Sequence, residues 1–203
     1  MKAIRWFMGL AAVVAVAGLI AGPVGATEEA AKKDEAAGME AMMAEYTTLA
    51  APNEHHAHLK NLVGNWKAET KFWAQPGAQP QVSTGKAQFE MVLGGRFLKT
   101  SYTGEFMGNS FEGIGYSGFD RLQGKHIDFW MDTMGTSVMK SEGHCEEDGK
   151  IVTLAGQIQD PTGKTMTMKT VSRVVSDNTI VFEMYGPDTT GKEFKTMEIT
   201  YTR

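Results

Sequence analysis

The segment 125–132 carries side chains that could perform acid–base chemistry. Alternate residues of an extended strand share a face, and one face here holds His126, Asp128, Trp130 and Asp132. A buried pair of carboxylates with an imidazole could transfer protons. Polar residues that alternate with apolar ones are, however, typical of a strand with one face in water. We therefore expect the polar face to be in solvent and the apolar residues between to be in the core.

Trp130 argues for the opposite orientation, because a large aromatic ring is costly to leave in water. If that face points inward, Asp132 becomes the best polar anchor for a ligand. Arg96 is a second candidate, since a guanidinium can hold a carboxylate through two parallel hydrogen bonds. We expect Arg96 instead to bridge to an acidic side chain such as Glu112 or Asp120.

Three histidines raise the question of a metal site. His55, His56 and His58 lie in a predicted helix over residues 54–62, with Asn53 as its N-cap, and only positions 55 and 58 share a face. Metal sites normally use three or four ligands, and the sequence has no other cluster of His or Cys. We expect the histidines at the solvent edge of the helix and no dedicated metal site.

Cys145 is the only cysteine, so the chain has no internal disulfide. His144 precedes it, but neighbours along a strand point to opposite faces. Three acidic residues follow, and nearby negative charge disfavours the thiolate that a nucleophile needs. We expect Cys145 to be a small residue near a turn.

The first 26 residues have the three parts of a cleavable export signal. Lys2 and Arg5 precede an apolar run over residues 6–21, and small residues follow up to Ala26. The run is shorter than the about 20 residues that a membrane span needs. We expect cleavage after Ala26, a periplasmic or secreted location, and no stable membrane insertion afterwards.

Charge restricts the partners of the remaining chain. Removal of residues 1–26 takes away Lys2 and Arg5 and no acidic residue, which leaves 18 Lys+Arg against 24 Asp+Glu. Phosphate attraction dominates nucleic-acid affinity, so an acidic chain without a basic stripe is not expected to bind nucleic acid. Anionic membrane surfaces are disfavoured for the same reason.

Residues 27–53 are rich in Ala, Glu, Lys and Met. We expect a disordered lead over 27–37, followed by one short amphipathic helix that Pro52 ends. Met39, Met42, Met43 and Tyr46 have helical spacing. Their face is expected to lie on the domain or on a partner.

From residue 54 to the end, one domain is predicted, and after its short helix it is all β. Ten segments alternate in polarity and are separated by short turns that contain Gly, Pro, Asn or Asp. They are Asn65–Ala74, Ser83–Leu93, Phe97–Phe106, Ser110–Asp120, Lys125–Asp132, Thr136–Cys145, Ile151–Ile158, Thr165–Val175, Thr179–Tyr185 and Glu193–Thr202. This pattern favours an up-and-down antiparallel barrel, since closure removes exposed edges.

Several motifs agree in order with a known family. They are His58-Leu59-x-x-Leu62-Val63-Gly64-x-Trp66, Leu93-Gly94-Gly95-Arg96-Phe97-Leu98, Phe111-Glu112-Gly113-x-Gly115-Tyr116-x-Gly118-Phe119-Asp120, Trp130-x-Asp132-x-x-Gly135-Thr136 and Met197-Glu198-Ile199-Thr200-Tyr201-Thr202-Arg203. Over about residues 39–203 the chain resembles DUF1579, a bacterial family of unknown function, with Phe119 where a Tyr is expected. The resemblance implies a lipocalin-like barrel and no particular reaction.

Gly64-Asn65-Trp66 is similar to the start of many lipocalin-like barrels. In those folds the Trp closes one end of the barrel under an Arg of the last strand, which would be Arg203 or, as the alternative, Arg173. Nitrobindin-like proteins share a related barrel and hold haem through a His near the end of the chain. The last histidine here is His144, so we expect no haem and no other cofactor.

A barrel of this size with many methionines suits a small apolar or amphipathic ligand. The candidate ligand-binding residues are Phe89, Met91, Arg96, Tyr102, Trp130, Asp132 and Met168. Two alternatives remain: a hydrolase- or isomerase-type enzyme with a His/Asp site inside the barrel, and a non-catalytic interaction protein with a packed barrel. A lining of carbon and sulfur alone would favour binding, a desolvated His–Asp pair the enzyme, and a filled interior the interaction protein.

Overall fold

The computed structural model describes residues 24–146, 149–160 and 162–203. All but the last three residues of the expected export signal lie outside the described residues. The chain divides into two units, residues 1–45 and residues 46–203.

A single helix, α1 (Val24–Ala50), covers the region where a disordered lead and a short helix were expected. The lead is helical because its Ala, Glu and Lys residues have high helix propensity, and Lys32 donates to Glu28 over one turn at 3.0 Å. The four residues of the Met-containing stripe are 49% to 58% exposed. Within the described residues, no helix is both long and apolar enough to cross a membrane.

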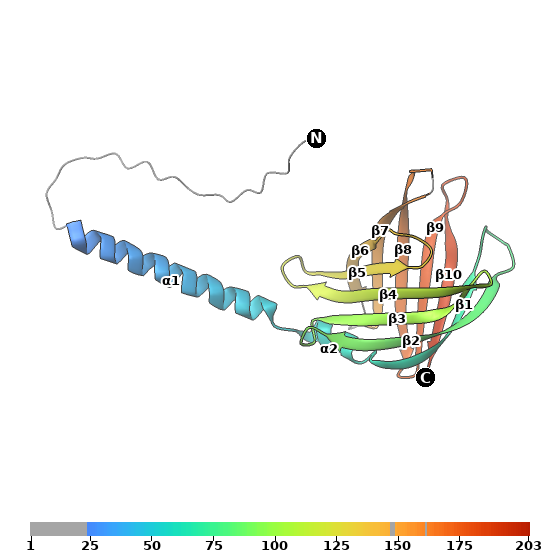
Figure 1. Ribbon diagram of the computed structural model, residues 1–203, viewed down its shortest axis with the longest axis horizontal. Coiled ribbons are helices and arrows are strands. Elements are labelled where there is room, and N and C mark those ends of the chain that lie inside the picture. Colours follow the sequence, from blue (N-terminus) through green and yellow to red (C-terminus); the bar gives the residue numbers. More distant parts are fainter. Residues whose placement is uncertain (1–23, 147–148, 161) are drawn as a thin grey trace. The chain divides into compact units, whose positions relative to one another are not determined.

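Ten strands form a closed antiparallel barrel in which each strand pairs with the next and the last pairs with the first (Figure 1). The strands are β1 (Gly64–Phe72), β2 (Gln81–Val92), β3 (Phe97–Phe106), β4 (Asn109–Asp120), β5 (Lys125–Asp132), β6 (Met139–Glu146), β7 (Ile151–Gln159), β8 (Thr165–Ser176), β9 (Thr179–Pro187) and β10 (Glu193–Thr202). The predicted up-and-down barrel is confirmed. Only β6 begins clearly later than expected, because residues 133–138 belong to the turn before it.

A short helix, α2 (Glu54–Lys60), packs against β2, β3 and β4. Asn53 is its N-cap, as predicted, and the Asn53 backbone N–H donates to His56 Nδ1 at 3.1 Å. His56 and Leu59 are buried against the barrel. The expectation that the histidines lie at the solvent edge is therefore wrong, because the apolar stripe and the imidazoles share the side of α2 that meets the barrel.

The register decides which face of β5 is inside. Directly paired residues of neighbouring strands point to the same side. The buried Trp66 pairs with Ala87, Ala87 with Tyr102, Tyr102 with Gly113, and Gly113 with Asp132. This chain of pairs places Asp132 inside the barrel.

The other polar residues of β5 share that inner face: His126, Asp128 and Trp130. Our expectation that they face solvent is wrong, and the apolar residues between them line the outer wall. The physical reason is the Trp130 ring, which lies over Gly113 and Gly115 and packs against the core. Two neighbouring positions without side chains give this large ring an interior place.

Arg203 closes one end of the barrel over Trp66, as the resemblance implied. Its guanidinium lies 4.3 Å from the centre of the Trp66 ring, a cation–π contact. Arg203 Nη1 donates to the Val63 carbonyl at 2.9 Å, and Trp66 Nε1 donates to the Leu62 carbonyl at 2.9 Å. Arg173, the alternative, instead pairs with Glu183 on the outer wall.

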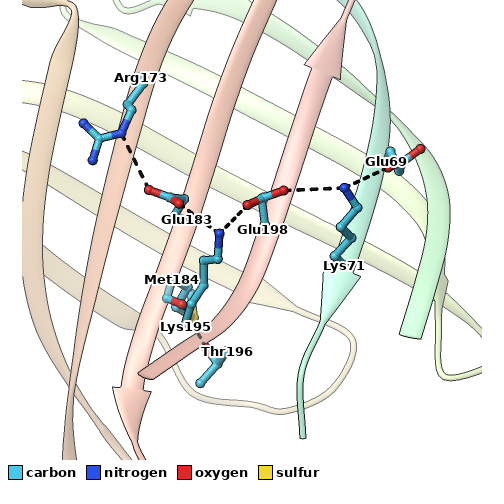
Figure 2. A network of polar contacts seen from close by, with 8 residues as sticks. All are labelled: Glu69, Lys71, Arg173, Glu183, Met184, Lys195, Thr196 and Glu198. Carbon is cyan, nitrogen blue, oxygen red and sulfur yellow. Dashed lines mark hydrogen bonds and ion pairs between the residues drawn. The ribbon is translucent and has the colours of Figure 1, made fainter. Parts of the chain in front are cut away.

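The outer wall carries a ladder of six alternating charges across β8, β9, β10 and β1 (Figure 2). In order it runs Arg173, Glu183, Lys195, Glu198, Lys71, Glu69. The Lys71–Glu198 pair, at 3.6 Å, joins β1 to β10 where the barrel closes. Exposed pairs contribute little one by one, but this network lies on the closing seam.

We predict that Gly113→Ala destabilises the fold by about 1–3 kcal/mol, because a Cβ there would lie 2.2 Å from the Trp130 ring. Gly135→Ala is the matched control, since its Cβ would meet nothing nearer than 3.9 Å. The control should change stability by less than about 0.5 kcal/mol. Urea unfolding measures both, and equally small effects would contradict the inward position of Trp130.

Candidate functional site

The structure separates the predicted ligand-binding residues into an inner group and Arg96. Paired positions place Phe89, Met91, Tyr102, Trp130 and Met168 on the inner face of the barrel. Arg96 lies instead in the turn between β2 and β3, at the end of the barrel near α2. Asp132 ends β5 at the opposite end.

Arg96 has a local partner rather than an acidic one. Its Nη1 donates to the Leu93 carbonyl at 3.1 Å. Among the described side chains, neither Glu112 nor Asp120 forms the predicted ion pair with it. Asp120 accepts instead from the backbone of its own turn, at Leu122 and Gln123. Arg96 therefore belongs to the β2–β3 turn and not to the inner face of the barrel.

Asp132 is inside the barrel but its carboxylate is already satisfied. Trp130 Nε1 donates to Asp132 Oδ2 at 2.8 Å, and the Met134 backbone N–H donates to Oδ1 at 2.9 Å. Both oxygens are thus used to fix Trp130 and the following turn. Asp132 positions the aromatic ring, which makes it a weaker anchor for a ligand than its location suggested.

Asp128 is the interior carboxylate that our ligand-binding set omitted. Ser117 Oγ donates to Asp128 Oδ2 at 2.7 Å, and burial raises the pKa of Asp128 to about 6. No Lys or Arg among the described residues lies within ion-pair distance of it. The residue as a whole nevertheless keeps intermediate exposure, so its carboxylate loses much of its hydration although the residue is not fully buried.

Ser141 is the cross-strand partner of Asp128 on β6 and points to the same side. Its residue is only 2% exposed, and its Oγ has no hydrogen-bond partner among the described residues. Buried hydroxyls normally have a partner. Asp128, Ser117 and Ser141 therefore form a polar patch with unused hydrogen-bonding capacity, which we call the interior polar patch.

Apolar and phenolic side chains surround the interior polar patch. Tyr102 and Thr70 share a hydrogen bond of 3.2 Å. Burial, and then the proximity of Tyr102 and Asp128, strongly raises the pKa of Tyr201. Inward residues that stay partly exposed while packing on the core are Met91, Phe111, Trp130, Phe182 and Met197. No large side chain of the described barrel is completely buried, so these inner residues keep some accessible surface.

His126 and Asp128 do not form the desolvated pair that the enzyme alternative requires. Although they share a face of β5, His126 contacts His55 and Asp128 contacts Ser117. Each therefore has a partner on a different element. His126 and Asp128 are therefore not arranged as a His–Asp pair for general acid–base catalysis.

His55, His126 and Cys145, which we call the histidine cluster, come from three separate elements of the fold. His126 Nε2 on β5 lies 3.3 Å from His55 Nδ1 on α2, and Cys145 Sγ on β6 lies 3.5 Å from the same nitrogen. The three ligand atoms are within 4.8 Å of one another. His144 and Cys145 point to opposite faces, as predicted, and the structure places His144 outward and Cys145 inward. The cluster is not visible in the sequence, because His126 and Cys145 follow His55 by 71 and 90 positions.

Neighbouring rings hold the cluster in place. The His55 ring stacks on Phe119 with centroids 3.8 Å apart. Burial, followed by the nearby His55, lowers the pKa of His126 to about 4, which keeps its imidazole neutral. His58 Nδ1 is buried without a partner among the described residues and lies against Gly149. His56 is occupied by its bond to Asn53 and serves the start of α2.

Two hollows of about 440 and 550 Å³ lie along β1, β2 and β10, and the larger one also reaches β3. Outward side chains such as Lys67 and Lys86 form much of their lining. Neither hollow includes the interior polar patch or the histidine cluster. Both hollows are depressions of the outer wall.

The family is established by the match to residues 51–203, which fit the family described as "Protein of unknown function (DUF1579)". The chain belongs to this family. The match begins later than the position 39 expected from the motifs, so the Met-containing part of α1 lies outside it. Among curated proteins, no sequence matches this DUF1579 chain.

A solved structure is similar to the DUF1579 barrel in fold. The crystal structure of Rv2717c from M. tuberculosis has 16% sequence identity and a TM-score of 0.55, and the alignment covers 75% of this chain and 98% of that chain. A redesigned β-barrel has 16% identity and a TM-score of 0.38, with 72% and 94% covered. At such identity the likeness to Rv2717c supports the fold alone.

We predict that Asp128→Asn stabilises the protein at neutral pH by about 1–3 kcal/mol. Because the folded state raises the pKa of Asp128 from 3.8 to about 6, the wild type binds this proton more tightly when folded. It therefore loses stability as the pH rises from about 4 to about 6. Asn is always neutral and still accepts a hydrogen bond from Ser117.

Urea unfolding at several pH values between about 4 and 7.5, in a chelating buffer, measures the effect. The wild-type free energy of unfolding should fall relative to that of Asp128→Asn across this range. Parallel curves for the two proteins would show that Asp128 is not desolvated in the folded state.

Proposed function

We propose that this DUF1579 protein is exported and that its barrel binds a small amphipathic molecule whose polar end donates hydrogen bonds. The observation that carries the proposal is Asp128, an interior carboxylate with a raised pKa and no cationic partner among the described residues. An isolated carboxylate is costly away from water. A ligand that brings a donor or a positive charge would remove that cost.

The surroundings of Asp128 define the rest of the ligand. Ser141 Oγ, beside it, is free to accept or donate a further hydrogen bond. Methionine and aromatic side chains line the same inner face and stay partly exposed. Methionine adapts to irregular apolar shapes, and a ten-stranded barrel is wider than the eight-stranded barrels that hold one small ligand. These features support an apolar body attached to one polar end.

The charge of Asp128 predicts which polar end of a ligand binds best. At pH 7.5 a group with a pKa of about 6 is mostly ionised. An alkylamine or an alcohol should therefore bind better than a fatty acid of equal length, because the carboxylate of the fatty acid would face a second negative charge.

We predict that decylamine displaces the fluorescent probe N-phenyl-1-naphthylamine at about tenfold lower concentration than decanoate, a difference of about 1.4 kcal/mol. Decanol should lie between them. Asp128→Asn should remove the preference for the amine. Asp132→Asn is the matched control and should keep it, because both oxygens of Asp132 already have partners in the protein.

Competition curves for the three decyl compounds against the same probe test this prediction. A wild-type protein that binds decanoate as well as decylamine would contradict the role of Asp128. So would a preference for the amine that survives Asp128→Asn.

Export is proposed from the order of residues in the first 26 positions. A basic start, an apolar middle and small residues before Ala26 form the pattern that signal peptidase reads. The cut would fall two residues after Val24, where α1 begins. Most of α1 would then remain on the mature protein.

We predict that the protein made in its native cells begins at Thr27. Ala26→Arg should leave the precursor uncut, because a long charged side chain does not fit a pocket for small residues. Ala30→Arg, a change of the same kind at an exposed position in α1, should be processed normally. Mass spectrometry of the N-terminal peptide distinguishes the outcomes, and a cell-associated wild-type chain that still begins at Met1 would contradict export.

A further inference from the structure

The distances between the nitrogen and sulfur atoms of the histidine cluster match those between the ligand atoms of a tetrahedral metal site. With the usual bonds of about 2.0–2.1 Å to nitrogen and about 2.3 Å to sulfur, tetrahedral angles place two nitrogens about 3.4 Å apart and a nitrogen and a sulfur about 3.6 Å apart. The His126–His55 separation is 3.3 Å, and the Cys145–His55 separation is 3.5 Å. Two of the three distances between ligand atoms are therefore already those of a tetrahedral site.

Hydrogen bonding alone satisfies this arrangement poorly. Both His126 Nε2 and Cys145 Sγ approach the same atom, His55 Nδ1. A neutral imidazole nitrogen carries either one hydrogen or one lone pair, so it cannot serve two partners well. The separation of 3.3 Å is also longer than the usual range for N–H bonds. A cation between the three atoms would accept a lone pair from each.

We propose that His55, His126 and Cys145 bind one Zn²⁺ ion. Two imidazole nitrogens and one thiolate form a donor set that suits zinc and copper and does not suit Mg²⁺ or Ca²⁺, which prefer oxygen. Three protein ligands leave the fourth position of a tetrahedral ion for water or an added ligand. His58 stays outside the set because its Nδ1 lies against Gly149.

Zinc binding would release one proton from the protein. The bond between sulfur and zinc forms as the Cys145 thiol releases its proton to solvent, and each imidazole donates a lone pair without losing a proton. The bound ion would then carry a net charge of about +1 with its ligands. The nearest carboxylate along β5 is Asp128, one inward position from His126.

The proposed site also has a mechanical consequence. His55 comes from α2, while His126 and Cys145 come from β5 and β6. The ion would therefore link the helix to the barrel wall. Because a ligand that binds only the folded state stabilises it, zinc should raise the Tm of the protein.

The test uses the reduced full chain, with Zn²⁺ for calorimetry and Co²⁺ as the spectroscopic probe. We expect one ion per chain and a thiolate-to-cobalt charge-transfer band, which requires a sulfur ligand. Cys145→Ser should abolish the band and weaken Zn²⁺ binding by more than about 100-fold, since even groups behind the ligands contribute 10–100-fold. His55→Gln should weaken binding to a similar extent.

His144→Gln is the matched control, because His144 is next to Cys145 but exposed on the outer wall. It should keep the band, the stoichiometry and the affinity. Zn²⁺ should also protect Cys145 from alkylation in the wild type and in this control. Protection is independent of the decyl-compound assay, so the metal site and the proposed ligand can fail separately.

Two results would overturn the proposal. One is the absence of saturable Zn²⁺ or Co²⁺ binding by the reduced wild type at micromolar protein. The other is a wild-type affinity for Zn²⁺ in Cys145→Ser. Because Ser is nearly isosteric with Cys but supplies no thiolate, this result would assign the ion to other groups.

Discussion

Closure of the barrel is the constraint on which the rest of this structure depends. Once β1 pairs with β10, every strand has two neighbours, and the register fixes each side chain as inner or outer. A shift of one residue in any strand would exchange its two faces. The inner position of Trp66 therefore determines, through successive pairs, the inner position of Asp132 four strands away.

The sequence was sufficient to predict the architecture, because alternation and turn residues are local signals. The ten strands, the Asn53 cap and the Arg203–Trp66 contact were all predictable from short patterns or from the family resemblance. The orientation of β5 was not, since both of its faces carry side chains that could be buried. The cost of exposing Trp130 outweighed the polarity of its neighbours, and the space that admits its ring comes from two glycines on another strand.

The sites depend on contacts between elements, which sequence spacing does not reveal. Cys145 and His55 meet because α2 folds back onto the end of the barrel where β6 finishes. Asp128 and Ser141 meet only through the β5–β6 register. Thus one polar face of one strand supplies two different environments. His126 lies under α2, and Asp128, one inward step further, belongs to the interior polar patch.

The charge ladder on the outer wall makes the closing seam tolerant of change. Glu183, Lys195, Glu198 and Lys71 each touch two oppositely charged neighbours, so the loss of Lys195 or Glu198 leaves every other member paired. The ladder also contains equal numbers of acids and bases (Figure 2). The seam is therefore an electrically balanced stripe in an acidic protein, and sequence drift at a single one of these positions need not open the barrel.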